Sequence, residues 1–436
     1  MRAARHAHAG RPAATIDAVN TSTIFDDSYW MRQAIEQGAQ VLYLTAPNPR
    51  VGCIIVRDGQ VLGSGATQAV GGPHAEVMAL RDMRRRGHDA ADATVYVTLE
   101  PCSHYGRTPP CVDALIEARP ARVVVAMLDP NPLVAGQGLA RLRAAGIAVT
   151  TSVCVHEALA INPGFIARMT RKTPWVWLKL AASLDGRSAL HNGVSQWITG
   201  TQARADGHHW RARSCVMLTG VGTVLADDPQ MNVRHVQTDR QPIKAVVDTR
   251  FEIPEDARLL DGGRTWVFTC RGDPAKAARL AGRNVQVIEL PAVHGPNEAL
   301  AGGGRADTLN AGGKLVVDES EAPGAGRVDL AEMMRWMGAN EINEVHVEAG
   351  SRLNGALLQA QCVDELLVYM APMLLGDALP MARLPALESL EQAARFEFFE
   401  TLALAPDIRL RARLGERWRA LLEAVQPVGV SQGYPE

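Results

Sequence analysis

Short apolar runs and helically spaced apolar residues alternate through the first 150 residues. Behind the polar residues Asp26, Asp27 and Ser28, segment 27–44 predicts a helix whose apolar residues are Trp30, Met31, Ala34, Ile35 and Leu42. Apolar runs predict strands at 51–56, 60–65, 94–99, 122–127 and 147–150. Helices are expected after His74, at 111–119 and at 138–145. This alternation predicts an α/β layer that binds ligands at strand ends.

A second α/β pattern follows a break in the chain. Residues 156–172 are expected to form one connecting helix, which Thr173 and Pro174 end. Further strands are predicted at 175–180, 245–248, 266–269, 285–290, 344–347 and 365–370. The Gly/Ala-rich stretch 291–326 is expected to be a loop insertion. The segment 426–436 is expected to be a loose tail.

The length of 436 residues is too great for one ordinary core. We therefore expect a flexible N-terminal tail (1–26), a first domain (27–150), a connection (151–173) and a second domain (174–425).

Composition and charge restrict the functional classes. The net charge of −2 does not favour binding to nucleic acid or to an anionic membrane, and no apolar run approaches the ~20 residues of a membrane span. Arg2, Arg5 and Arg11 precede no apolar segment, so a secretory signal is not expected. Seven scattered cysteines argue against a disulfide framework, and we expect a reducing cytoplasm.

Four residues of the first domain have the chemistry of a zinc site. His74 stands at a predicted helix start, and Cys102 and Cys111 flank a loop and a helix N-terminus that lowers thiol pKa. One imidazole and two thiolates can hold zinc and leave a fourth position open for water. Glu76, two residues from His74, is then the expected catalytic carboxylate that moves protons between water, ring nitrogen and departing ammonia.

Other interpretations of these residues are open. His104 could complete a structural site with four ligands, or the cysteines could be ordinary core residues. Eight residues separate Cys102 from Cys111, where the generic deaminase signature has two. The remaining cysteines are interpreted as buried thiols: Cys53, Cys154, Cys215, Cys270 and Cys362. Adjacent His208 and His209 point in different directions on a helix and are not expected to bind a metal.

The motifs of the first domain resemble those of a known family. Residues 101–111 read PCSHYGRTPPC, residues 47–52 read PNPRVG, and residues 74–76 read HAE. This set resembles the deaminase domain of the bifunctional riboflavin-biosynthesis deaminase/reductases, in which the wide cysteine loop is a variant of the signature. The resemblance implies that Asn48 contacts substrate. Met78 and Gln137 depart from the family's usual residues.

The second domain carries no GxGxxG after its first strand, so a Rossmann fold has little support. It carries KLAASLDGR at 179–187, SQWIT at 195–199, GVGTVLADDP at 220–229 and VEAGSRLNG at 347–355. The last of these predicts a strand, a Gly/Ser turn and a helix at 355–361, whose N-terminal N–H groups suit a phosphate. Gly220 and Gly222 offer a second close approach of the backbone, although either motif alone is also typical of an ordinary strand-to-helix turn.

Together these motifs resemble the reductase domain of the same family. The resemblance implies cofactor contacts from Ala181, Trp197, Thr223, Asp227, Gly350, Ser351, Arg352, Leu353, Asn354 and Gly355. It implies substrate contacts from Ser195, Arg211, Met231, Arg234 and Glu348. Arg211 and Arg234 suit a ribose 5-phosphate, and Glu348 suits polar groups of the ring or ribose.

The resemblance implies a cytidine-deaminase-like α/β/α domain followed by a dihydrofolate-reductase-like α/β domain, with Zn2+ and NADPH as cofactors. The implied reactions are deamination of 2,5-diamino-6-(5-phosphoribosylamino)pyrimidin-4(3H)-one and then reduction of its ribosyl chain to a ribityl chain. A small phosphorylated pyrimidine is the expected partner, in a homo-oligomer without nucleic acid or membrane. The alternatives are a deaminase of another free or tRNA base with an unrelated nucleotide-binding domain, and a binding protein with structural zinc.

Overall fold

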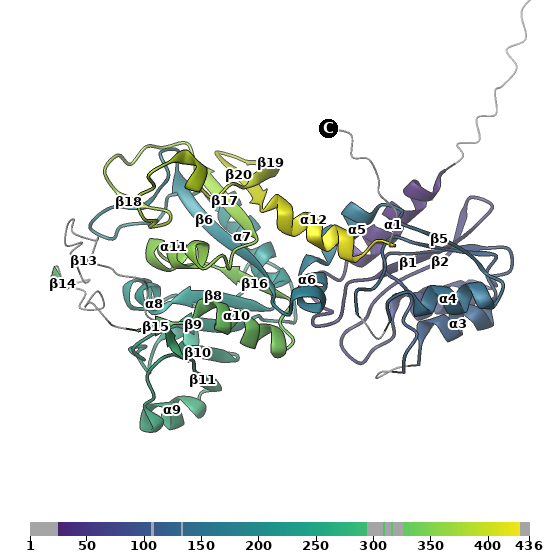
Figure 1. Ribbon diagram of the computed structural model, residues 1–436, viewed down its shortest axis with the longest axis horizontal. Helices are drawn as coiled ribbons and strands as arrows, with labels where there is room; N and C mark the ends of the chain where they lie inside the picture. The colour runs from purple at the N-terminus through teal and green to yellow at the C-terminus, as the bar shows by residue number, and fades with distance from the viewer. Residues whose placement is uncertain are drawn as a thin grey trace, which may run out of the picture.

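The computed structural model describes residues 25–105, 109–131, 134–293 and 326–427, and the backbone of 308–309 and 315–316. Residues 1–24 of the expected N-terminal tail, most of the expected insertion at 291–326 and residues 428–436 lie outside these ranges. Within them, two sheets form two bodies joined by helices (Figure 1).

The first sheet has the strand order β2-β1-β3-β4-β5. Its strands are β1 (Gly52–Arg57), β2 (Gln60–Ala66), β3 (Thr94–Val97), β4 (Arg122–Val125) and β5 (Ala148–Thr151). Strand β1 is antiparallel to β2 and β3, while β3, β4 and β5 are parallel. The start of β1 therefore lies at the same edge as the ends of β2 and β3. Helices on this sheet are α1 (Asp27–Ala39), α2 (Ala75–Arg85), α3 (Cys111–Ala118) and α4 (Gln137–Ala144).

Helix α1 is shorter than predicted. Asp26 caps it by accepting a hydrogen bond from Tyr29 N at 2.8 Å, and Trp30, Met31, Ala34 and Ile35 are buried as expected. It ends at Ala39, after which the chain tightens into turns that bond residues three apart, and Leu42 is only half-buried. The last turn of the helix packs closely against the start of β1, since a Cβ at Gly38 would lie 3.1 Å from Gly52 N.

The connecting segment forms two helices, α5 (Val155–Ile161) and α6 (Pro163–Arg171), where one was predicted. Pro163 has no N–H and is therefore suited to the first position of α6, where the backbone N–H has no partner within the helix. The Asn162 side chain turns away to bond both the N–H and the C=O of Arg50, each at 2.8 Å. The bend thus attaches the connection to the first domain.

The second sheet has nine strands in the order β11-β10-β9-β8-β16-β6-β17-β20-β19. Seven are parallel: β6 (Trp175–Ser183), β8 (Val216–Gly220), β9 (Ile243–Val247), β10 (Thr265–Thr269), β11 (Val285–Glu289), β16 (Glu344–Val347) and β17 (Glu365–Ala371). The antiparallel pair β20 (Asp407–Arg413) and β19 (Glu397–Leu404) extends one side. The mixed α/β fold predicted for both domains is confirmed.

The helices of the second domain are α7 (Thr201–Arg213), α8 (Val221–Asp227), α9 (Pro274–Ala281), α10 (Leu330–Ala339) and α11 (Ser351–Gln359). Short strand pairs are β7 (Arg187–Ala189) with β18 (Leu379–Pro380), β12 (Ala292–Val293) with β15 (Arg327–Val328), and β13 (Thr308–Leu309) with β14 (Leu315–Val316). Strands β12 and β15 stand at the two ends of the predicted insertion and pair with each other. None of the helices in the described ranges is both long and apolar enough to cross a membrane.

The C-terminal helix α12 (Gly415–Ala424) runs from the second body toward the first, beside α5 and α6 (Figure 1). Its buried residues Trp418, Leu421 and Leu422 belong to the same apolar cluster as the first domain's core. After the helix, Val425 O accepts a hydrogen bond from Leu128 N at 2.8 Å. The end of the chain therefore holds the two bodies together.

Candidate active sites

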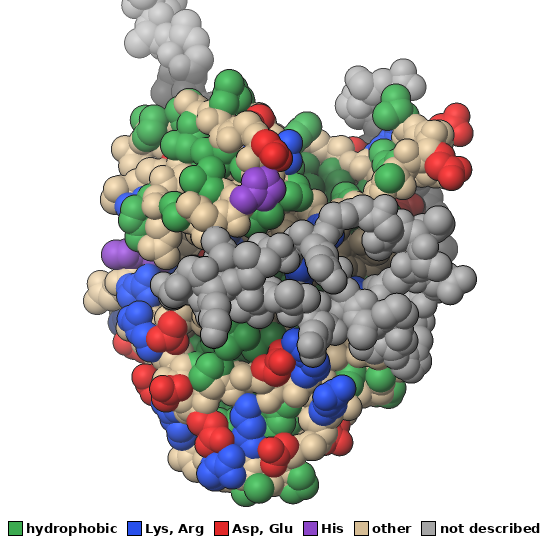
Figure 2. All heavy atoms as spheres, turned by 90° about the vertical axis from the view of Figure 1, so that its left-hand side faces the viewer, with side chains coloured by type: hydrophobic (Ala, Val, Ile, Leu, Met, Phe, Trp, Pro, Cys, Tyr) green, Lys and Arg blue, Asp and Glu red, His purple; other side chains and the backbone are tan. Residues whose placement is uncertain are grey.

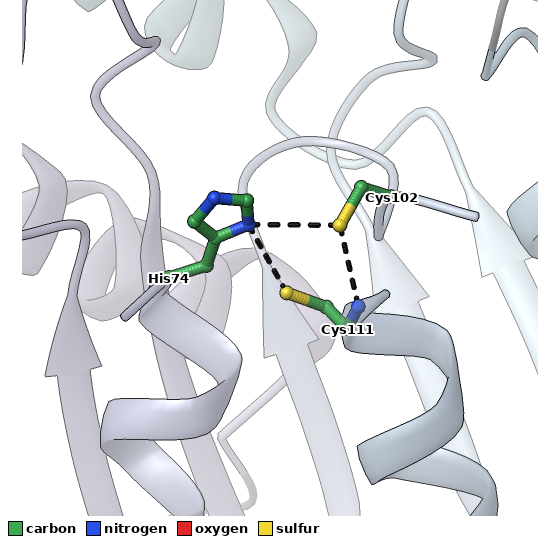
Figure 3. Close-up of side chains that lie close together, drawn as sticks. All are labelled: His74, Cys102 and Cys111. Carbon is green, nitrogen blue, oxygen red and sulfur yellow. Dashed lines mark hydrogen bonds between the residues drawn. The ribbon is translucent and has the colours of Figure 1, made fainter. Parts of the chain in front are cut away.

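Three of the predicted zinc-site residues converge at one edge of the first sheet. His74 is the N-cap of α2, Cys111 begins α3, and Cys102 lies in the loop after β3 (Figure 3). His74 Nδ1 lies 3.6 Å from Cys102 Sγ and 3.2 Å from Cys111 Sγ. The ligand atoms of all three residues lie within 4.8 Å of one another. The distances follow from the topology, because β2 and β3 end at the same edge.

Glu76 lies beside this group, in the first turn of α2, and is buried. Burial raises the pKa of Glu76 to about 7, and the neighbouring Cys102 adds to the effect. A hydrogen bond from Cys111 lowers the pKa of Cys102. The pKa of Cys111 is raised, because this residue is the partner in that hydrogen bond and because it is buried. A carboxyl group with a pKa near neutrality can both take and give a proton at pH 7.

The donor set fits zinc. One imidazole nitrogen and two sulfurs are ligands that zinc prefers, and three protein ligands are typical of a catalytic site with an open fourth position. His104 is not part of the cluster, which is the only group of its kind among the residues that the structure describes. This geometry favours a catalytic over a four-ligand structural site.

Glu100 is a structural residue of this site that the sequence analysis did not single out, although it precedes Pro101 and Cys102. Its buried carboxylate accepts hydrogen bonds from the N–H groups of Gly136 at 2.9 Å and Gly138 at 3.1 Å. Glu100 thereby ties the start of the cysteine loop to the N-terminus of α4. Its place directly before the Pro-Cys pair was the available signal.

The five other cysteines were all expected to be buried. Cys53, Cys215 and Cys362 are, but Cys154 and Cys270 are half-buried because they stand in loops after β5 and β10. His208 and His209 bind separate partners: His208 accepts a hydrogen bond from Arg234 N, and His209 bonds the hydroxyl of Tyr43.

In the second domain, the expected cofactor turns lie side by side because β8 and β16 are parallel neighbours. A Cβ at Gly220 would lie 3.2 Å from a methyl carbon of Leu353, and a Cβ at Gly350 would lie 3.8 Å from Thr223 Oγ1. Ala181 stands near the end of β6, which is the next strand beyond β16. Thus three strands end at one edge, as in other α/β ligand sites.

The predicted turn at 350–355 is largely helical. Gly350 is the N-cap of α11, which begins at Ser351 and not at Gly355. Gly355 is needed within the helix because a Cβ there would lie 1.8 Å from the carbonyl oxygen of Arg383. The glycine thus marks close packing of the helix and not its beginning. The free N–H groups at the N-terminus of α11 therefore lie at 350–353 and not after Gly355.

A charged cluster centres on Glu348, at the end of β16. Arg211 donates two hydrogen bonds to its carboxylate, each of 2.7 Å, and His346 Nε2 lies 3.3 Å from it. Burial opposes the charged form, but Arg211 and Lys179 outweigh it and hold the pKa of Glu348 well below its usual value. Lys179 and His346 were not predicted as site residues. The signals were a lysine inside an otherwise apolar strand and a histidine that shares a strand face with Glu348.

The other residues expected in this domain lie in different surroundings. Arg234 is exposed. Arg211 donates a hydrogen bond to Asn232 O, two residues before Arg234, so the two arginines are near each other. Met231 is buried, Ser195 is half-buried, and Asp227 ends α8 on the surface. Trp197 is 66% exposed, with the Arg204 guanidinium 4.4 Å above its ring. No contact joins Trp197 or Ser195 to the Glu348 cluster among the described interactions.

Comparison with known proteins identifies the family of the chain. A model of the cytidine and deoxycytidylate deaminase zinc-binding region matches residues 25–127, and a model of the RibD C-terminal domain matches residues 174–410. The chain is 44% identical over 398 residues to the riboflavin biosynthesis protein RibD of Escherichia coli (strain K12), covering 88% of this chain and 98% of that protein. The chain belongs to the RibD family.

Solved structures of RibD proteins agree. Acinetobacter baumannii RibD, form 1, has a TM-score of 0.75 at 39% identity, covering 89% of this chain and 98% of that one. The Thermotoga maritima structure, described as a diaminohydroxyphosphoribosylaminopyrimidine deaminase/5-amino-6-(5-phosphoribosylamino)uracil reductase, has a TM-score of 0.72 at 29% identity, covering 88% and 98%. The chain is therefore a bifunctional deaminase/reductase of riboflavin biosynthesis, with a zinc-binding deaminase domain and an NADPH-dependent reductase domain. The predicted family, activities and cofactors are confirmed.

Proposed function

We propose that the first site deaminates 2,5-diamino-6-(5-phosphoribosylamino)pyrimidin-4(3H)-one and that the second reduces the deaminated product to 5-amino-6-(5-phosphoribitylamino)uracil. The observation that carries the proposal is the convergence of His74, Cys102 and Cys111 beside buried Glu76. A base deaminase needs this combination, whereas a structural zinc site has no use for the carboxylate. We propose 27–150 and 174–425 as the limits of the two domains.

In the deaminase site, His74, Cys102 and Cys111 are the proposed metal ligands. Zinc, when bound there, makes water acidic near neutral pH. Glu76 takes one proton of the attacking water and gives it to the ring nitrogen. It then takes the remaining proton of the added hydroxyl and gives it to the amino group, which leaves as ammonia. Burial favours the protonated form of Glu76, which suits the steps in which this carboxyl group holds and gives a proton. Asn48 is the proposed contact to the substrate.

In the reductase site, the turns at 220–223 and 350–355 are proposed to hold the phosphates of NADPH, with Ala181, Trp197 and Asp227 as further contacts. NADPH supplies the hydride. Arg211 and Arg234 are proposed to bind the substrate phosphate, beside Ser195 and Met231. Glu348 has two roles in this proposal: it orients Arg211 through the paired hydrogen bonds, and it offers its carboxylate to hydroxyl groups of the substrate.

We propose that the enzyme is a cytoplasmic homo-oligomer without a nucleic-acid partner. The edge strand β19 supports association, because Phe398 and Phe399 expose apolar surface beside unpaired backbone groups. Acidic and basic side chains are interspersed in the lower part of the face in Figure 2, which gives no support there to a nucleic-acid patch of one sign.

The test follows both reactions in one purified protein. Ammonia release from the diaminopyrimidine phosphate measures the first step, and loss of NADPH absorbance measures the second. Glu76→Gln should abolish ammonia release while bound zinc stays, and Cys111→Ser should lose zinc and ammonia release together. Both variants should oxidise NADPH normally when given the deaminated intermediate. A Glu76→Gln enzyme that still releases ammonia at a comparable rate would refute the assignment of Glu76.

A further inference from the structure

The loop that leads into β1, residues 45–51, borders the deaminase site. Because Cys53 pairs with Val97 in antiparallel strands, this loop lies at the sheet edge from which the chain continues to Cys102. Gly52 N donates to Thr98 Oγ1 at 3.1 Å, which joins the end of the loop to the segment after β3. The loop therefore lies at the sheet edge where β2 and β3 end and from which the chain continues to the zinc-site residues.

Residues of the second domain hold this loop at two points. The first is Asn343, whose Nδ2 donates to the carbonyl oxygen of Pro47 at 2.9 Å. Arg168 of helix α6 fixes the amide by donating to Asn343 Oδ1 at 2.6 Å, which also determines which side of the amide faces Pro47. Asn343 is buried, so water does not replace these bonds.

The second point is Arg50. Its guanidinium makes two hydrogen bonds of 2.7 Å to the carboxylate of Glu344, which is fully buried. The same guanidinium donates to the carbonyl oxygens of Leu42 and Ile161, each at 3.0 Å. Such a planar group bonded on several sides has one orientation, and this anchor adds to the two hydrogen bonds by which Asn162 holds the backbone of Arg50.

Asn343 and Glu344 are consecutive residues where β16 begins, almost 300 positions away from the loop in the sequence. Within the loop itself, the hydrogen bonds join Thr45 to Asn48. Asn48 thus stands between Pro47, held by Asn343, and Arg50, held by Glu344. The position of Asn48 therefore depends on the reductase domain as well as on the connecting helices and the deaminase sheet.

We propose that Asn343 and Glu344 are positioning residues for deamination, which set the 45–51 loop and hence Asn48 at the substrate. This inference rests on the proposed function, in which Asn48 contacts the substrate. The deaminase pocket of this chain is completed from the reductase side, and a change at the start of β16 alters substrate binding in the other domain.

Asn343→Asp is the most direct test in the full-length enzyme. An aspartate keeps the oxygen that accepts from Arg168 but has no N–H for Pro47, so the loop loses one anchor. We expect KM for ammonia release to rise about tenfold, the effect of losing one well-placed hydrogen bond, while kcat changes less than about threefold. Zinc content and NADPH oxidation with the deaminated intermediate should be unchanged. Asn343→Ala, which adds no charge, should shift KM in the same direction.

The matched control is Arg171→Gln. Arg171 also joins the connection to the second domain, through a 2.7 Å bond from Nη1 to buried Asp364, but it does not touch the 45–51 loop. Its KM for deamination should stay at the wild-type value. An unchanged KM in both Asn343 variants, an equal rise in Arg171→Gln, or loss of zinc from the Asn343 variants overturns the inference. Wild-type enzyme that releases no ammonia would instead defeat the proposed function.

Discussion

Replacing Glu344 with glutamine tests how strongly the two domains are joined by buried charge. Glu344 is 0% exposed and Arg50 is 4% exposed, and the Glu344 carboxylate accepts two bonds of 2.7 Å from Arg50 and one of 3.3 Å from Arg213. The glutamine amide keeps one acceptor and turns an N–H₂ toward a guanidinium donor. The two guanidinium groups that share this carboxylate, Arg50 and Arg213, are then left buried without a compensating negative charge. Such a loss costs about 3–5 kcal/mol of the free energy of unfolding.

The sign of the pH dependence follows from the pKa of Glu344. Burial raises this pKa, but the charges of Arg50 and Arg213 outweigh it and leave the pKa below the usual value. The stabilisation is therefore complete above the unfolded pKa of about 4.3 and is lost as the pH falls through the lower folded value. The difference between wild type and Glu344→Gln should accordingly be full at pH 7.5 and shrink below about pH 4.

Urea unfolding followed by tryptophan fluorescence measures the difference, because Trp177 lies 4.7 Å from the Arg213 guanidinium and Trp175 packs against Trp418 at the junction. Glu157→Gln is the control, since Glu157 pairs with Arg32 at 3.6 Å with 46% and 59% of the side chains exposed. Exposed pairs contribute about 0–1 kcal/mol. Equal unfolding free energies for Glu344→Gln and Glu157→Gln at pH 7.5 would refute the reasoning.

Two further predictions concern a close approach of the backbone and a buried histidine. A Cβ at Gly65 would lie 2.5 Å from Ala79 N, so Gly65→Ala must displace α2 and, with it, the zinc-site residues at the start of that helix. We expect the affinity for zinc to fall at least about tenfold, while the rate of NADPH oxidation is unchanged. Dialysis against a chelator measures this, with Gly207→Ala, which meets nothing within 4 Å, as control; equal zinc retention in both variants contradicts the prediction. Burial and the charge of Arg211 lower the pKa of His208 to about 4. As the pH falls, this histidine is therefore protonated in the unfolded chain before it is protonated in the folded protein. The free energy of unfolding should accordingly fall as the pH drops from about 6.5 to 4. In urea titrations at several pH values, the free energy of unfolding of His208→Gln should depend less on pH than that of the wild type. The same pH dependence in both proteins would contradict the prediction.

Much of the fold follows from local pattern. The apolar runs placed β1, β3 and β4 correctly within a residue or two, and the helix starts at His74 and Cys111 were correct. Errors occurred where a contact distant in sequence decides the backbone. Helix α1 ends where its last turn packs closely against β1, and the connection bends where Asn162 bonds Arg50. Gly355 was interpreted as part of a turn because the carbonyl of Arg383, which it must accommodate, is 28 positions away.

The sequence by itself determined the chemistry of the zinc site. His74 and Glu76 are two residues apart, and Cys102 and Cys111 flank one loop, so residue type and local spacing already define the donor set and its proton carrier. Only the tertiary structure decided which residues pair across the chain: Arg211 with Glu348, Arg50 with Glu344, and Asn343 with Pro47. The physical reason is that hydrophobic periodicity fixes the kind and faces of each element but not the order of strands in a sheet. Strand order brings β16 to the junction, and with it the second domain's hold on the first domain's active-site loop.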